Sequence, residues 1–147
     1  MRVLIVEDEA KMAGLIQKGL RQEAIAADIA PKGEDALWMA GSTEYDAIVL
    51  DLMLPGIDGF EVCRRLRADL RTAFLPVLML TAHESAEFVA KGFAVGTDDY
   101  VAKPFRREDL IARVRRMLER TYGRDAAEPA AAPTAARAAV GNDATLQ

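Results

Sequence analysis

Five short apolar runs, separated by stretches long enough for helices, constrain the fold of this chain more than any other feature of its sequence. The runs are rich in Val, Ile and Leu and are mostly continuous, which is typical of strands buried on both faces. They predict strands at 3–6, 27–30, 47–50, 77–80 and 100–102. Because crossovers between parallel strands are right-handed, the simplest architecture is α/β with a doubly wound, five-stranded parallel sheet.

The stretches between the runs carry signals of helices. Apolar side chains at three- and four-residue spacing predict two core-facing stripes, Met12, Leu15, Ile16 and Leu20, and Leu110, Ile111, Val114, Met117 and Leu118. Residues 58–61, Asp-Gly-Phe-Glu, are similar to a capping box that opens a third helix. Three glycines fall at the expected loops or helix ends, namely Gly33, Gly56 and Gly96.

The sequence changes in texture after Gly123, where Ala, Pro and small polar residues replace large apolar side chains. We predict one domain at 1–122 and a flexible linker or tail at 123–147, in which Pro129 and Pro133 would interrupt a transient helix. A single domain fits the length of 147 residues.

Composition excludes several classes of function. A net charge of −4 gives no general attraction to DNA or to an anionic membrane. No apolar stretch approaches the roughly 20 residues that span a bilayer. Cys63 is the only cysteine, which excludes an internal disulfide and a cysteine metal cluster and suits a reducing cytoplasm.

Polar groups follow four of the five predicted strands, at the edge where open parallel sheets bind ligands. They are Glu7 with Asp8, then Asp51, Thr81 and Lys103. Three converging carboxylates repel one another and raise each other's pKa unless a cation offsets their charge. Oxygen ligands with room for water suit Mg²⁺ better than zinc or a fully caged calcium, so Mg²⁺ is the cofactor that we expect.

These groups suit phosphoryl transfer. Mg²⁺ and Lys103 would let the site accept a dianionic phosphoryl group. Asp51 would be the nucleophile, forming an acyl phosphate in line with the leaving nitrogen of a phosphohistidine. Thr81 and Lys103 would each donate a hydrogen bond to a phosphoryl oxygen.

Each residue also has a plainer interpretation. Asp8 could cap the first helix, Thr81 could cap a helix that begins near residue 84, and Lys103 alone would be an ordinary surface lysine. Asp51 directly follows a buried strand, where a charge without a purpose is costly. The joint arrangement at four strand ends favours the functional interpretation.

Four motifs stand at these strand ends: Val-Leu-Ile-Val-Glu-Asp-Glu at 3–9, Asp-Leu-Met-Leu-Pro-Gly-Ile-Asp-Gly at 51–59, Leu-Met-Leu-Thr-Ala at 78–82 and Gly-Thr-Asp-Asp-Tyr-Val-Ala-Lys-Pro-Phe at 96–105. Together they resemble the receiver domains of two-component response regulators, and within them the OmpR/PhoB-type. The resemblance covers residues 1–121. It implies a flavodoxin-like, CheY-like receiver with strand order 2-1-3-4-5.

The resemblance implies roles for the acidic residues. Asp8, Asp51 and the backbone carbonyl of Met53 would bind Mg²⁺, and Glu7 would act directly or through water. Asp51 would be the phosphoacceptor, and a sensor histidine kinase would be the donor.

The resemblance also implies a switch. Thr81 would move toward the phosphoryl group and vacate space into which Tyr100 rotates, with Ala82 and Lys103 beside the group. The rotation would remodel the face of the fourth helix, fifth strand and fifth helix, as a population shift between two packings. From composition alone, Tyr100 is an ordinary half-buried aromatic of a strand.

In this subfamily that face forms a homodimer through salt bridges. The resemblance implies that Asp98 and Asp99 pair with Arg113 and Arg115 of a second copy, the alternative being a solvated basic helix. At two positions where the family often carries a basic and an acidic residue, this chain has Val89 and Ala94. These departures would weaken the dimer or change its packing.

His83, the only histidine, lies two positions beyond Thr81. We interpret it as a residue that tunes water access, and hence self-dephosphorylation, rather than as a phosphorelay histidine.

We therefore expect a signalling switch rather than an enzyme, with at most slow self-dephosphorylation. Its output would be transcriptional, through a DNA-binding domain that is absent from this chain; the alternative is a stand-alone receiver that acts by protein contacts. A flavin carrier or an aspartate-nucleophile phosphatase is disfavoured. Acids at 7–9 replace a Gly-rich phosphate loop, and Met53 stands where the phosphatase needs a second aspartate.

Overall fold

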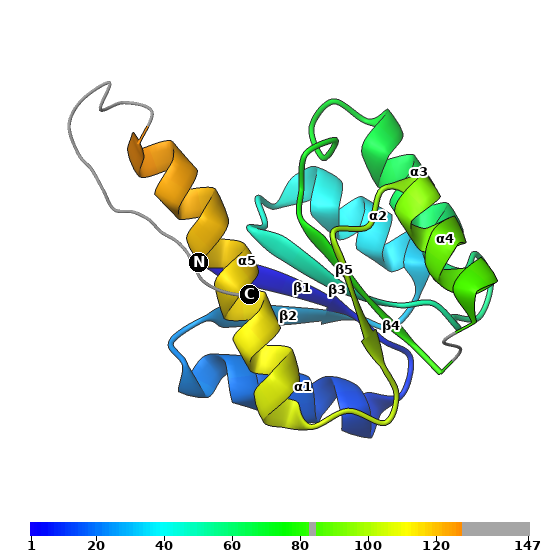
Figure 1. Ribbon diagram of the computed structural model, residues 1–147, viewed down its shortest axis with the longest axis horizontal. Helices are drawn as coiled ribbons and strands as arrows, with labels where there is room; N and C mark the ends of the chain where they lie inside the picture. Colours follow the sequence, from blue (N-terminus) through cyan, green and yellow to red (C-terminus); the bar gives the residue numbers. More distant parts are fainter. Residues whose placement is uncertain (83–84, 128–147) are drawn as a thin grey trace. The chain divides into compact units, whose positions relative to one another are not determined.

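Strands and helices alternate along the chain in this computed structural model, which describes residues 1–82 and 85–127 (Figure 1). The strands are β1 (Arg2–Val6), β2 (Ala26–Ala30), β3 (Ala47–Asp51), β4 (Val77–Thr81) and β5 (Asp99–Ala102). The helices are α1 (Ala10–Gln22), α2 (Gly33–Ser42), α3 (Gly59–Ala68), α4 (Ala86–Val95) and α5 (Arg107–Ala127). All five predicted strands are present, and each is one residue longer than predicted.

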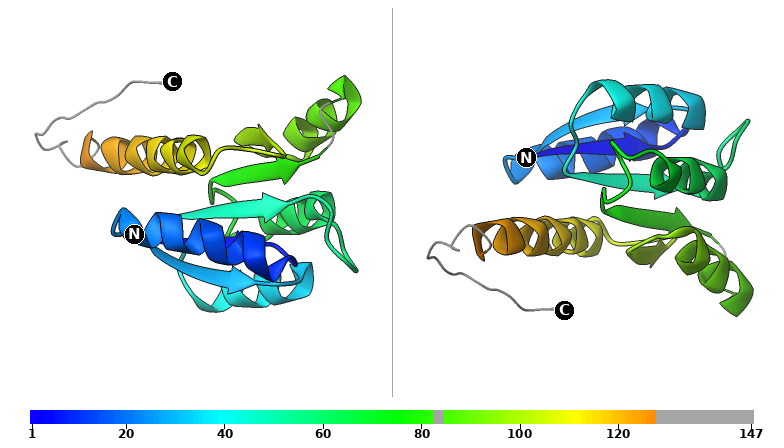
Figure 2. Two further views of the ribbon diagram at one scale, coloured as in Figure 1. Left: turned by 90° about the horizontal axis from the view of Figure 1, so that it is seen from below. Right: turned by 90° about the horizontal axis from the view of Figure 1, so that it is seen from above.

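The five strands form one parallel sheet in the order β2-β1-β3-β4-β5, which confirms the predicted α/β architecture and strand order. The right-hand view of Figure 2 shows β2, β1, β3 and β4 side by side in this order. Helix α1 covers one face of the sheet, and α2, α3 and α4 lie on the other (Figure 1). Strands β3 and β4 are buried throughout, and this explains their unbroken apolar runs.

The core between the sheet and helices α2 and α3 is built from large aliphatic side chains. Its fully buried members include Leu4, Ile48, Leu50, Leu66 and Met79. Phe88 of α4 and Tyr100 of β5 pack against the same core from its margin. This packing fixes the strand ends, where the polar residues of the predicted site stand.

One predicted helical stripe is partly wrong. Ile16 and Leu20 of α1 are buried as expected, but Leu15 is 48% exposed, and Ala13 is buried instead. At about 100° per residue, Leu15 lies roughly a third of a turn away from the side that Ala13, Ile16 and Leu20 share. The core-facing side of α1 is therefore narrower than predicted, and it includes the small residues Ala13 and Gly19.

Half of the predicted capping box forms at the start of α3. The Asp58 side chain accepts a hydrogen bond from the backbone N–H of Glu61 at 2.9 Å. The Glu61 carboxylate does not return to the cap, because it pairs with Arg64 at 2.5 Å and Arg65 at 2.6 Å. These two guanidinium groups lower the pKa of Glu61 to about 2.

The last described helix extends farther than the sequence suggests. Helix α5 runs to Ala127, so residues 123–127 of the predicted linker are helical. Residues 1–107 form one compact unit, and the described residues of α5 from Glu108 to Ala127 belong to a second unit. Residues 128–147 lie outside the described part, and the division at residue 122 stays a prediction. Among the described helices, none is sufficiently long and apolar to cross a membrane.

Candidate functional site

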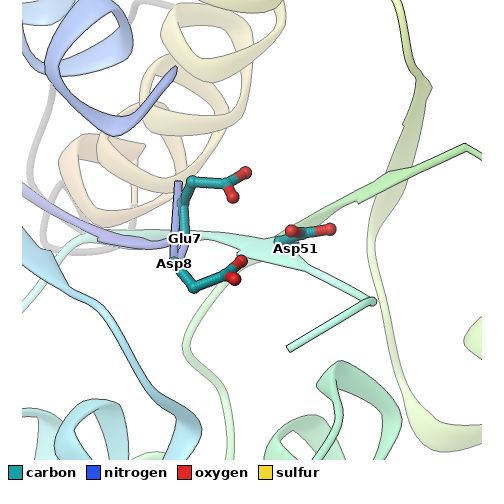
Figure 3. A group of neighbouring side chains, drawn as sticks. All are labelled: Glu7, Asp8 and Asp51. Atoms are coloured by element: carbon teal, nitrogen blue, oxygen red, sulfur yellow. The ribbon is translucent and has the colours of Figure 1, made fainter. Parts of the chain in front are cut away.

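Three carboxylates gather at the carboxyl edge of the sheet (Figure 3). Glu7 and Asp8 follow β1, and Asp51 is the last residue of β3, which pairs with β1 in parallel. One oxygen from each residue lies within 4.8 Å of the others. Glu7 and Asp51 are each only 2% exposed, whereas Asp8 is exposed. The structure therefore brings together the three acids that the sequence selected.

Lys103 supplies a positive charge to the two buried acids. Its Nζ lies 3.2 Å from Glu7 Oε1 and 3.1 Å from Asp51 Oδ2. Burial and the nearby charge of Asp51 raise the pKa of Glu7, although the N–H of Glu9 and Lys103 oppose this shift. Burial alone would lower the pKa of Lys103, but the charges of Asp51 and Glu7 outweigh burial and raise it. Lys103 is thus a bridging ammonium and not an ordinary surface lysine.

Backbone groups orient the same carboxylates. The N–H of Glu9 donates to Glu7 Oε2 at 3.0 Å, and the N–H of Met53 donates to Asp51 Oδ1 at 3.2 Å. Gly59, the first residue of α3, lies so close to β3 that a Cβ there would be 2.6 Å from the carbonyl oxygen of Asp51. The sequence analysis gave neither Glu9 nor Gly59 a role in the site. For Gly59, the signal in the sequence was a glycine directly after the predicted helix cap Asp58.

Thr81 ends β4 and is 1% exposed. Its carbonyl accepts a hydrogen bond from the N–H of Lys103 at 2.7 Å, so the ends of β4 and β5 are joined at the site. Ala82 follows it and is exposed, and His83 lies outside the described residues.

The helix-cap interpretations of Asp8 and Thr81 are wrong. The N-cap of α1 is Glu9. The N-cap of α4 is Ser85, whose hydroxyl accepts a hydrogen bond from the N–H of Phe88 at 3.2 Å. Neither Asp8 nor Thr81 is therefore needed to begin a helix.

Tyr100 lies on the same face of the sheet as Thr81. Tyr100 is paired with Met79 and Thr81 with Ala102, and residues two apart on a strand point to the same face. The Tyr100 hydroxyl donates to the backbone carbonyl of Phe88 at 2.7 Å. Its ring is therefore docked on α4.

The predicted dimer residues are distributed over both compact units. Asp98 is already engaged within its own chain, because its Oδ2 accepts from Arg67 Nη2 at 3.1 Å and from the N–H of Val77 at 2.8 Å. Asp99 begins β5. The remaining predicted positions are Arg113 and Arg115 on α5 and the departures Val89 and Ala94 on α4.

The acidic cluster fits a small divalent cation. Its donors are carboxylate oxygens from two neighbouring strands, and hard oxygen donors that leave room for water match the preferences of Mg²⁺. Glu7, Asp8 and Asp51 would hold the ion. A bound Mg²⁺ would neutralise carboxylate charge and leave the site able to accept an anion.

Comparison with known families and relatives agrees with this geometry. Residues 3–115 match the response regulator receiver domain. The chain is 45% identical over 120 residues to the transcriptional regulatory protein TcrA of Mycobacterium tuberculosis, covering 82% of this chain and 47% of TcrA. It is 46% identical over 125 residues to the transcriptional activator protein IrlR of Burkholderia pseudomallei, covering 85% of this chain and 53% of IrlR. The chain thus spans about half the length of the curated relatives it matches.

Solved structures of response regulators are also similar to this chain. The receiver domain of the Francisella response regulator 1452 is 35% identical with a TM-score of 0.77, over 82% of this chain and 98% of that one. DrrB of Thermotoga maritima, described as an OmpR/PhoB homolog, is 36% identical with a TM-score of 0.74, over 82% of this chain and 53% of DrrB.

Proposed function

This chain belongs to the response regulator receiver family, and from that premise we propose that it accepts a phosphoryl group on Asp51 from a sensor histidine kinase. The observation that carries the proposal is the position of Asp51, buried at a strand end between Lys103 at 3.1 Å and the acids Glu7 and Asp8. A buried carboxylate with one bridging ammonium and two neighbouring acids suits a reaction in which a metal cation and an anionic phosphoryl group bind at the same site.

The transfer would proceed by attack of an Asp51 carboxylate oxygen on phosphorus. The bond from phosphorus to the imidazole nitrogen of the donor histidine breaks, and its electron pair returns to the imidazole. Glu7, Asp8, Asp51 and the backbone carbonyl of Met53 would hold Mg²⁺, which when bound offsets charge on the phosphoryl oxygens. The product is an acyl phosphate on Asp51, so Asp51 is the acceptor of the phosphoryl group.

Lys103 and Thr81 would bind the transferred group. Lys103 already contacts Asp51, so a small shift of its ammonium would give a charge-assisted hydrogen bond to a phosphoryl oxygen. Thr81 ends the neighbouring strand, and its hydroxyl would donate to a second oxygen, beside Ala82. Tyr100, on the same face as Thr81, would then leave α4 and rotate toward the space that Thr81 vacates.

The output would be a homodimer that controls transcription, through a DNA-binding domain beyond these residues. TcrA and IrlR are named as a transcriptional regulator and an activator, and this chain matches about half of each. Asp98 and Asp99 would pair with Arg113 and Arg115 of a second copy to form the dimer contacts. Asp98 would exchange its present contact with Arg67 for this one.

Intact-mass measurement tests the assignment of Asp51. We expect the parent protein, incubated with acetyl phosphate and Mg²⁺, to gain the mass of one phosphoryl group, and chelation of Mg²⁺ to prevent this. Asp51→Asn should not be labelled. Asp58→Asn is the matched control, because Asn caps a helix as well as Asp does, so its labelling should equal that of the parent. Labelling that survives in Asp51→Asn would exclude Asp51 as the acceptor.

A further inference from the structure

Gly92, in the interior of α4, is buried against the ring of Tyr100. A Cβ at position 92 would overlap the Tyr100 hydroxyl oxygen and would lie 2.5 Å from Cε2 and 2.6 Å from Cζ. These distances are shorter than real Cβ contacts, so the ring occupies the space that any side chain at position 92 would need. The missing side chain of Gly92 forms a notch in α4, and Tyr100 fills it.

Two further contacts hold Tyr100 in this notch. Its hydroxyl donates to the carbonyl of Phe88, one helical turn before Gly92, at 2.7 Å. Its ring also lies beside the ring of Phe93, with the two centroids 5.7 Å apart. The docked position of Tyr100 therefore depends on α4 at three adjacent points.

A glycine in a helix interior needs a reason, because it destabilises the helix relative to alanine. Gly14 in α1 offers the contrast, since a Cβ there would meet nothing within 4 Å. The space beside Gly92 is instead filled by the one aromatic side chain to which we assign a switch role.

We infer that Gly92 is a positioning residue for Tyr100. Its notch gives Tyr100 a docking place on α4 that competes with rotation of the ring toward Thr81. Filling the notch would expel the ring and so lower the free energy needed to reach the rotated packing. The docking stands on the contacts above, whereas the competition rests on the proposed function of Tyr100.

A double-mutant cycle on stability tests the docking. Gly92→Ala is made in the parent and in a Tyr100→Ala background, and the urea midpoint of unfolding is measured for all four proteins. We expect Gly92→Ala to lower the midpoint in the parent, because the ring is displaced, and to raise it in the Tyr100→Ala background, because only the gain in helix propensity remains. Gly14→Ala is the matched control and should raise the midpoint equally in both backgrounds. Equal effects of Gly92→Ala in the two backgrounds would overturn the inference.

Affinity for a phosphoryl mimic tests the competition. With Mg²⁺ present, calorimetric titration with beryllium trifluoride should give several-fold tighter binding to Gly92→Ala than to the parent, and no such gain between the two Tyr100→Ala proteins. Unchanged or weaker binding to Gly92→Ala would overturn the inference. Failure of the parent itself to bind the mimic would instead count against the proposed function, while the stability cycle still decides whether Tyr100 docks at Gly92.

Discussion

At the scale of single residues, the site is organised by the need to balance buried charge. Glu7 and Asp51 are almost fully buried, and a buried carboxylate is tolerated only with a partner. Lys103 contacts both of them, and the N–H groups of Glu9 and Met53 each donate a hydrogen bond to one of them. One ammonium against two buried acids and the exposed Asp8 leaves an excess of negative charge, which is the electrostatic basis for expecting a cation.

A second group of interacting polar side chains includes Arg2 at the start of β1, Asp28 in β2 and Tyr45 just before β3. The Tyr45 hydroxyl donates to Asp28 Oδ2 at 2.8 Å, and Asp28 also pairs with Arg2 at 3.0 Å. Burial and the hydrogen bond to Asp28 raise the pKa of Tyr45 from 10.0 to about 12. The neutral phenol is therefore the form that the folded state favours.

This shift predicts a loss of stability at alkaline pH. The pKa of Tyr45 is higher in the folded than in the unfolded chain, so its contribution is complete below pH 10.0 and is lost as the pH rises toward about 12. We expect the urea midpoint of the parent to fall more steeply across this window than that of Tyr45→Phe. Parallel plots of urea midpoint against pH for the two proteins would show that Tyr45 is not responsible. In a separate titration followed by phenolate absorbance, Tyr45→Phe should lack the component that ionises at the most alkaline pH.

At the scale of elements, Arg67 ties the end of α3 to two loops. Its guanidinium donates to the carbonyls of Ala73, Leu75 and Gly96 at distances between 2.6 and 3.2 Å. It also pairs with Asp98 at 3.1 Å. The loop before β4 and the turn between α4 and β5 are therefore held by one side chain, which fixes where β5 begins.

Removing this tie should destabilise the protein. We expect Arg67→Met to lower the free energy of unfolding by about 2–4 kcal/mol, because several carbonyls lose a charged donor at once. Urea denaturation measures this loss. Arg64→Met, on the same helix, is the control and should change little, because Arg64 is exposed and its bond to Glu61 lies in water. Similar losses in the two variants would show that the hydrogen bonds of Arg67 add no more to the free energy of unfolding than an exposed ion pair does.

At the scale of the whole molecule, the parallel sheet places the ends of different strands at one edge, and the repulsion between the acids there opposes folding. A cation that binds only the folded state removes this repulsion and stabilises the fold by mass action. The stability of the whole unit of residues 1–107 should therefore respond to Mg²⁺.

This coupling predicts that Mg²⁺ raises the midpoint of thermal unfolding. At 100 times the dissociation constant the gain should be about 2.7 kcal/mol. Asp8→Asn should abolish most of the shift, whereas Asp58→Asn, which keeps its helix cap, should retain it. An equal Mg²⁺ shift in Asp8→Asn and the parent would contradict the proposed set of ligands.

The sequence by itself determined the architecture and the composition of the site edge. Strand positions follow from local apolar runs, and the carboxyl ends of parallel strands must share an edge, so Glu7, Asp8, Asp51 and Lys103 could be placed together without coordinates. The sequence predicted less well which side chains of a helix face the core. Apolar periodicity marks only a broad side of the helix, and Leu15 lies at the exposed margin of that side.

Only the tertiary structure decided which side chains actually meet. Arg67 pairs with Asp98, which is 31 residues away in the chain, and Tyr100 docks at Gly92. Sequence patterns are blind to these partners, because local spacing fixes the direction of a side chain along its own element but not the neighbour that crossing elements bring to it. The distances between elements, set by core packing, make that choice.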